Sequence, residues 1–253
     1  MKATKTKNNK KVISYSFLMF LMLLGLVVLL SPTAYSLPSG AGITYNSTAG
    51  TPSSTPGNRT DPRGTITTLV LDATQQVQTW KGYVGNVTGA LSLKDSSDYT
   101  LYDWDLSGVT ITGQVYSTRN GSVDFSSVSC VSTPTVNSED TFNNLSSTQT
   151  DNINNTFNYQ NHTSFYVGTH QITANSCKST ATYINSTAQT VNETADFQEV
   201  LLEDSGNNLI YTTLIEDNVN GYNLNPYDFQ MIVAESPLKS TPTTYYFFTE
   251  ISS

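Results

Sequence analysis

Apolar and polar residues alternate with a period of two along three neighbouring segments of the chain. Leucines alternate with polar residues at 91–94, Tyr, Trp and Leu alternate with aspartates at 102–106, and Val and Ile alternate with Thr and Gln at 109–115. Successive side chains of a β-strand point to opposite faces, so this period is typical of strands with one buried face and one face in water. Polar turn residues at 95–98 separate the first two segments. We therefore expect consecutive antiparallel strands.

Further strand signals continue to the end of the chain. An Asn-Gly pair within residues 119–122 predicts a tight hairpin, a second hairpin is expected across 197–215, and residues 227–233 have the pattern of a single-faced strand. The pattern fades between residues 132 and 160, where we expect a long polar loop. Aromatic residues at 245–248 are apolar on both faces, which places that strand in the interior of a sheet or beneath another subunit. The predicted fold class is all-β, an antiparallel β-sandwich of the jelly-roll or immunoglobulin-like type.

The first 36 residues have the three parts of a secretory signal peptide. Five lysines and no acids occupy residues 1–16, an unbroken apolar run follows at 17–30, and small residues lead to Ser36. The run of 14 apolar residues is shorter than the roughly 20 that a membrane-spanning helix needs, so we expect cleavage after Ser36. The alternative is an uncleaved anchor, in which Val12 and Ile13 extend the run. With cleavage, we expect a secreted chain without a membrane span.

Residues 37–64 are rich in Pro, Ser, Thr and Gly and predict a flexible linker before a β-sandwich domain at 65–253. The start of that domain, residues 65–79, has two interpretations. It is a donor strand that pairs with a neighbouring subunit, or it begins a strand, 66–85, of its own sheet. If subunits join, the expected contacts lie in this segment and in the aromatic strand near the C-terminus, at Ile66, Leu69, Leu71, Tyr246 and Phe248.

Composition restricts the partners. After residue 36 the chain keeps 7 cations against 20 acids, a net charge of about −13. Such a surface repels phosphate groups, which argues against nucleic acids and anionic membranes as partners. Charged residues make up only 13% of the chain, so hydroxyl and amide groups supply most of the polar surface.

Two cysteines, Cys130 and Cys177, follow the signal segment. An isolated pair in an exported chain predicts one disulfide, and the alternative is two buried free thiols. The chain has no C-x-x-C motif, and its two histidines, His162 and His170, lie in a Thr- and Asn-rich segment without a second cluster of ligands. Metal or redox chemistry is therefore not expected at these positions.

The most frequent short motif is Asn-x-Ser/Thr, the acceptor of N-linked glycans on exported proteins. Nine copies in a chain of 253 residues favour glycosylation, although an Asn- and Thr-rich polar surface produces the same motif. The nine asparagines are Asn46, Asn58, Asn86, Asn120, Asn144, Asn154, Asn161, Asn185 and Asn192.

Motifs of the common enzyme classes are absent from the sequence. It has no G-x-S-x-G, no Walker loop, no H-E-x-x-H and no G-x-G-x-x-G. We therefore expect a protein that is not an enzyme. The alternative is a glycoside hydrolase, which needs two carboxylates facing each other. The candidate carboxylates for such a pair are Glu199, Glu203, Asp103 and Asp105.

We expect no cofactor, with one alternative. Residues 216–221 place oxygen-bearing side chains at alternate positions before a glycine, as in the first half of an EF-hand loop. A Ca²⁺ site there would draw its ligands from Glu216, Asn218, Asn220 and Asp228. An Asn-Gly turn between two strands explains the same residues.

Several longer segments resemble a group of archaeal exported surface proteins. The resemblance is carried by TWKGYVGNVTGALSLKD, LYDW, GQVYSTRNGSVDF, SFYVGTHQI, SCKST and YDFQMIV. A looser, architectural similarity connects the chain with archaeal filament subunits, which have cleaved signals and β-sandwich bodies that join by strand donation. These resemblances imply a class of surface protein and no catalytic residues.

The leading hypothesis is therefore a structural subunit of an extracellular cell-surface assembly, a filament or pilus or a surface layer, that polymerises by β-strand addition as a homo-oligomer. The alternative is a monomeric secreted adhesin or carbohydrate-binding module, in which tryptophans stack on sugar rings. An exposed tryptophan would favour that alternative. Because Trp104 alternates with acids, we expect it to point into the core.

Overall fold

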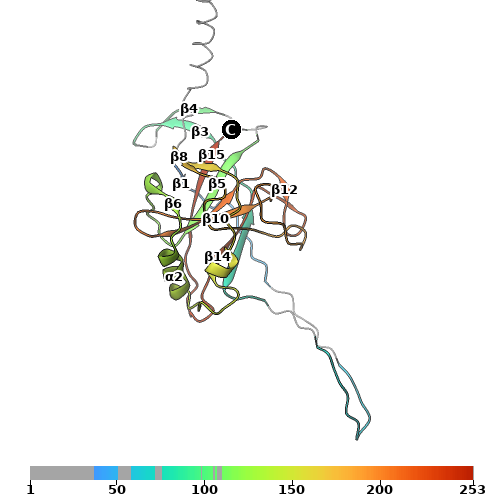
Figure 1. Ribbon diagram of the computed structural model, residues 1–253. Coiled ribbons are helices and arrows are strands. Elements are labelled where there is room, and N and C mark those ends of the chain that lie inside the picture. The colour runs from blue at the N-terminus through green and yellow to red at the C-terminus, as the bar shows by residue number, and fades with distance from the viewer. Residues whose placement is uncertain are drawn as a thin grey trace, which may run out of the picture. The chain divides into compact units, whose positions relative to one another are not determined.

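The computed structural model describes residues 37–50, 58–71, 76–97, 99–104, 106 and 110–252. The predicted signal peptide, residues 1–36, and its cleavage site lie outside this part of the chain. The described residues form mostly antiparallel strands with a few short helices (Figure 1), which confirms the all-β class.

The main sheet has seven strands, all antiparallel to their neighbours. Its order is β1 (Ser39–Gly40), β15 (Tyr246–Ser252), β5 (Thr112–Thr118), β11 (Leu209–Leu214), β10 (Gln198–Glu203) and β6 (Ser129–Cys130), with β9 (Ser179–Ala181) also paired to β10. The two-stranded units are β2 (Trp80–Gly85) with β14 (Phe229–Ala234), β3 (Leu91–Lys94) with β4 (Thr100–Trp104), β7 (Phe165–Val167) with β8 (His170–Ile172), and β12 (Val219–Asn220) with β13 (Pro226–Tyr227). The helices are η1 (Phe125–Ser127), α2 (Thr133–Phe142) and α3 (Ile153–Thr156).

Both faces of the main sheet are buried. On β10, Leu201 belongs to a first core that the sheet shares with β14, α2 and α3, whereas Val200 and Leu202 belong to a second core beneath β7, β8 and η1. On β5, Val115 points into the first core and Tyr116 into the second. The expectation of one face in water holds where β5 begins, since Thr112 is exposed, and is wrong from Gln114 onward, because elements distant in the sequence cover both faces there. Burial of each such apolar side chain stabilises the fold by about 1.5–3 kcal/mol.

The hairpin expected across residues 197–215 is confirmed as β10 and β11, with Glu203 opposite Leu209. In its turn, Oδ1 of Asp204 accepts hydrogen bonds from the N–H groups of Gly206 and Asn208, at 2.9 and 3.0 Å. The carboxylate thus provides acceptors for two N–H groups of the turn.

The hairpin expected at Asn120 and Gly121 is wrong. Oδ1 of Asn120 accepts from the N–H of Ser122 at 2.9 Å, so the side chain organises an open turn. The chain then passes through η1 to β6, and β6 pairs with β10 instead of β5. The Asn-Gly pair does form a turn here, but the strand that follows it does not pair with the strand that precedes it.

The long loop expected at residues 132–160 is also wrong, because it contains α2 and α3. Oγ of Ser132 accepts from the N–H of Thr135 at 3.4 Å and caps the start of α2. Oδ1 of Asp140 accepts from the N–H of Ile153 at 2.8 Å and ties α2 to α3. Polar residues thus fix this helical layer on the first core.

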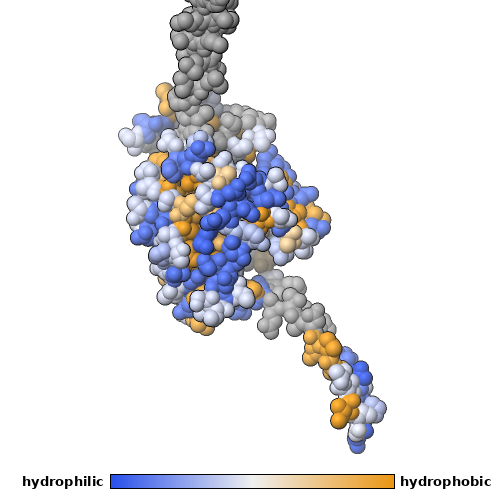
Figure 2. Space-filling model, in the orientation of Figure 1, coloured by the Kyte–Doolittle hydropathy of each residue, from blue (hydrophilic) through white to orange (hydrophobic). Residues whose placement is uncertain are grey.

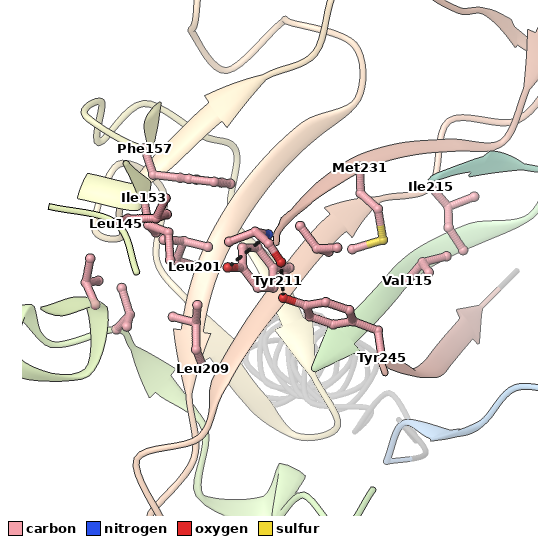
Figure 3. Packing of buried hydrophobic residues seen from close by; sticks show 14 of the residues in the cluster. Val115, Leu145, Ile153, Phe157, Leu201, Leu209, Tyr211, Ile215, Met231 and Tyr245 are labelled. Atoms are coloured by element: carbon pink, nitrogen blue, oxygen red, sulfur yellow. Dashed lines mark hydrogen bonds between the residues drawn. The ribbon is translucent and has the colours of Figure 1, made fainter. Parts of the chain in front are cut away.

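Strand β14 packs on one face of the main sheet. The edge of β14 that is not paired with β2 points toward that face. Oε2 of Glu199 accepts from the N–H of Ile232 at 2.9 Å, and the hydroxyl of Tyr245 donates to the carbonyl of Ala234 at 2.6 Å. Figure 3 shows the rings of Tyr211 and Tyr245 meeting beside this edge, among the apolar side chains of the first core. Side chains of the sheet therefore satisfy the main-chain groups that β14 presents to it.

Candidate assembly surfaces

A segment with exposed apolar side chains precedes the first long strand. Residues 66–71 belong to no strand, and Ile66, Leu69, Val70 and Leu71 are 102, 56, 95 and 86% exposed. The space-filling view shows apolar patches on this extended part of the chain (Figure 2). Strand β2 begins only at Trp80 and pairs with β14. The alternative of one continuous strand over residues 66–85 is therefore wrong for 66–71, while their pairing with another chain stays a prediction.

The predicted linker begins with a short edge strand. Ser39 and Gly40 of β1 pair with Thr249 and Phe248 of β15, and the N–H of Ala41 donates to the carbonyl of Phe247 at 3.0 Å. This pairing explains why the first residues after the predicted cleavage site are held on the sheet. The described residues 41–50 and 58–64 beyond it are exposed and form no strand, and their role as a linker stays a prediction.

The hairpin of β3 and β4 has one apolar face. Leu91 lies opposite Trp104 and Leu93 lies opposite Tyr102, so these four side chains share a face. The rings of Tyr102 and Trp104 meet edge to face with their centroids 5.1 Å apart. The other face carries the polar pair Ser92 and Asp103. The sequence thus predicts this pairing correctly.

The apolar face of the β3–β4 hairpin is uncovered within the described part of the chain. Leu93, Tyr102 and Trp104 are 50, 60 and 50% exposed, and all five residues of β4 are exposed. The expectation that Trp104 points into the core is wrong, because the hairpin forms a separate two-stranded ribbon. An isolated hairpin is marginally stable in water, and exposed apolar patches mark interaction sites. This face is the strongest candidate for a binding surface.

The two C-terminal residues expected at subunit contacts differ in position. Tyr246 is 47% exposed, at the start of β15. Phe248 packs against Phe125 in the second core, with ring centroids 5.2 Å apart. Adjacent residues of β15 point to opposite faces, and Phe247 packs on the first core. The two-faced apolar character of this strand is therefore explained largely within the chain itself.

The predicted disulfide is confirmed. Cys130 and Cys177 are bonded, with their Cα atoms 4.9 Å apart. Next to Cys177, Nε2 of the fully buried His162 accepts from the N–H groups of Ser176 and Cys177, at 3.2 and 3.0 Å. Two donors at Nε2 place the ring proton on Nδ1, which donates to the carbonyl of Thr163 at 2.7 Å. Burial is the largest cause of the lowered pKa of His162.

Three of the four candidate carboxylates lie in the described part of the chain, and each has different surroundings. Glu199 is buried beneath β14, and this burial raises its pKa well above the usual value. The carboxylate of Glu203 accepts from the hydroxyl of Ser132 at 3.0 Å at the start of α2. Asp103 is exposed on β4, and Asp105 lies outside the described residues.

The candidate Ca²⁺ ligands serve a turn. The two carboxylate oxygens of Asp228 accept from the N–H of Val87 at 2.7 Å and of Asn218 at 3.0 Å. Burial raises the pKa of Glu216, and the nearby Asp196 adds to that effect. Asn220 lies in β12. Across the described ranges, no group of three or more His, Cys, Asp and Glu side chains is placed to hold a metal ion.

None of the nine asparagines of the glycosylation motifs is buried. Asn120 and Asn154 are half-buried, and the other seven are exposed. Asn144 and Asn185 have φ of 56° and 47°, which asparagine tolerates in turns. Glycosylation at these positions stays a prediction.

A polar pocket that sequence reasoning missed lies between the end of β5, α2 and the β10–β11 turn. It has a volume of about 180 Å³ and is lined in part by Asn120, Ser138 and Asn208. At its wall, the guanidinium of Arg119 donates two hydrogen bonds to Glu139, at 2.7 and 2.6 Å. No local sequence motif predicts this pocket, because three segments that are far apart in the sequence form it.

Comparisons of the chain with protein-family models, with curated proteins and with solved structures find no match. Within the described residues, no helix has both the length and the apolar character that crossing a membrane requires.

Proposed function

We propose that this chain is a structural subunit of an extracellular cell-surface assembly, a filament or a surface layer, whose copies join by β-strand addition. The observation that supports the proposal most directly is the segment 66–71, with its four large apolar side chains exposed and its backbone outside every sheet. Strand addition buries such side chains and pairs such a backbone in one step. Leu69 and Leu71 share one face of an extended strand and would set its register.

The remaining parts of the proposal concern export and surface chemistry. A cleaved signal peptide, N-linked glycans at the nine motifs and an archaeal origin belong to it, on the basis of the sequence patterns and the resemblance. The disulfide supports an oxidising compartment. The stacking of the β2–β14 pair on the main sheet supports a β-sandwich body.

Replacing Leu69 and Leu71 together by aspartate tests the donor segment. Two carboxylates buried at an apolar contact would lose hydration without gaining a partner, which weakens association. A loss of about 1.4 kcal/mol in the free energy of association lowers the association constant roughly tenfold, and we expect at least this effect. Size-exclusion chromatography and electron microscopy measure assembly, and circular dichroism verifies that the domain stays folded.

The matched control replaces Leu224 and Leu238 by aspartate. Both leucines are also exposed, at 53 and 77%, and both lie outside the donor segment. The control is expected to assemble like the unaltered chain. If the Leu69 and Leu71 variant also assembles normally, the donor-strand proposal is wrong.

A monomeric carbohydrate-binding module is the second candidate, and the exposure of Trp104 and Tyr102 favours it. Aromatic faces bind the apolar sides of sugar rings. A glycan array probed with the unaltered chain and with the Trp104→Ala variant separates the candidates. Monomeric particles with glycan binding that depends on Trp104 would support the module and exclude the structural subunit.

A further inference from the structure

The proposed function leaves open where the donor segment binds, and two open strand edges compete for it. One is the edge of β2 turned away from β14, and no hydrogen bond among the described residues reaches the main chain of Gly82 or Val84 there. The other is the outer edge of β4, whose described hydrogen-bond partner is β3 alone. An edge with unpaired N–H and C=O groups is a template for another strand.

The side chains distinguish these two edges. On β2, Trp80 and Tyr83 already pack on the first core, and Val84 is the only exposed large apolar residue of the strand, at 38%. On β4, all five residues are exposed, and the apolar face that Tyr102 and Trp104 share with β3 is uncovered. An added strand beside β2 would gain little apolar contact, whereas one beside β4 would extend an apolar face.

We propose that the segment 66–71 of one copy adds to the outer edge of β4 in a second copy and turns the β3–β4 hairpin into a three-stranded sheet. This inference rests on the proposed function and names its joint. The donor has six residues and β4 has five, so their lengths match. Three strands with an apolar face reach the size at which a small sheet becomes stable, so the added strand completes the hairpin.

The charges of the two surfaces are complementary. Arg59 and Arg63 precede the donor and are two of only seven cations in the chain after residue 36. On the hairpin, Asp95 and Asp103 are exposed, and they outnumber its one described cation, Lys94. Arg59 already pairs with Asp61, and Arg63 forms no ion pair with any described residue. Opposite charges on donor and acceptor steer the encounter and disfavour the pairing of two identical surfaces.

The donor and the acceptor are two different surfaces of the chain, so their contact links copies head to tail. The donor segment precedes β2, which begins at Trp80, and the β3–β4 hairpin follows β2, which ends at Gly85. Donor and acceptor are therefore connected to opposite ends of that strand (Figure 1). In such a contact each copy keeps one free donor or one free acceptor, so further copies can add. The result is a fibre unless the rotation between neighbouring copies closes a ring.

Cross-linking between single-cysteine variants tests this joint. Chains with Leu69→Cys are mixed with chains with Tyr102→Cys, allowed to assemble, and treated with a short bismaleimide, which leaves the native disulfide intact. We expect covalent dimers in the mixture and none with either variant alone. The matched control replaces the acceptor by Val84→Cys, on the edge of β2, and is expected to yield at least tenfold less dimer.

Each outcome has one meaning. Dimers with Val84→Cys in place of Tyr102→Cys, or assembly with cross-links at neither position, overturn the hairpin joint and leave the proposed function standing. Absence of assembly in the unaltered chain overturns both. Dimers restricted to the pair of positions 69 and 102 establish the joint.

Discussion

His162 and Glu199 are buried ionisable residues with shifted pKa values. The two shifts make the stability of the fold depend on pH in opposite directions. Burial lowers the pKa of His162 and raises that of Glu199, because both charged forms lose hydration. The hydrogen bonds agree with neutral forms, since His162 accepts at Nε2 and Glu199 has one oxygen, Oε1, without a partner. Neither role follows from the sequence, where Glu199 is a candidate carboxylate for hydrolysis and His162 has no assigned role.

At His162 we predict a loss of stability on acidification. The folded pKa lies below the unfolded value of about 6.5, so the unfolded chain binds more protons as the pH falls below that value. The contribution of His162 to the free energy of unfolding therefore decreases from pH 7.5 to pH 5.5, whereas that of Glu199 changes in the opposite direction. Urea titrations of both chains at both pH values isolate the His162 contribution, because acidification is expected to change the stability of the His162→Gln variant less unfavourably than that of the unaltered chain. An equal change in both chains would contradict this role.

At Glu199 the sign is reversed. The folded pKa lies above the unfolded one, so the folded chain binds more protons and loses stability as the pH rises from about 4.5 toward the folded value. Glu199→Gln keeps an acceptor for the N–H of Ile232 and removes the ionisation. We expect this variant to melt a few degrees above the unaltered chain at pH 7.5, since about 1 kcal/mol shifts Tm by roughly 2–4 °C.

A second variant verifies the contact at Glu199. Glu199→Leu leaves the N–H of Ile232 without an acceptor, which costs about 1–3 kcal/mol and lowers Tm. If Glu199→Gln is less stable than the unaltered chain at pH 7.5, the buried carboxylate has a role that this account misses.

Among the elements, local patterns predict the strands better than the layers. The pairing of β3 with β4, the β10–β11 hairpin and the strand near residues 227–233 follow from alternation and turn residues, which are local properties. Burial of both faces of β5 depends on elements far away in the sequence, so alternation alone predicts a wet face wrongly. Helix α2 is hidden by its polar composition, and its only local signal is Ser132 followed by Pro134 in the first turn.

The disulfide closes the segment that contains α2 and α3, and its cysteines are 47 positions apart in sequence. The chain-entropy model values such a closure at about 4 kcal/mol. The double variant Cys130→Ser with Cys177→Ser is therefore expected to lose about that much free energy of unfolding, measured in urea. Hydrogen exchange should accelerate most in residues 131–176. A loss below about 1 kcal/mol would show that the cores alone hold this segment.

At the scale of the whole molecule, the described chain has a body with two large buried cores and two apolar features outside it. These features are the donor segment 66–71 and the face of the β3–β4 hairpin. The sequence predicts the donor segment as one of two interpretations, because a run of apolar residues does not say which chain will cover it. It does not predict the acceptor, because the exposure of Tyr102 and Trp104 depends on what the rest of the fold leaves uncovered.

Electron microscopy of the native cell surface tests the central claim most directly. Filaments or sheets containing this chain are predicted, with an extended segment of each copy lying along the β3–β4 hairpin of the next. The Leu69 and Leu71 aspartate variant is expected to remove them. Dispersed single domains on the surface or in the medium of cells with the unaltered chain would contradict the account.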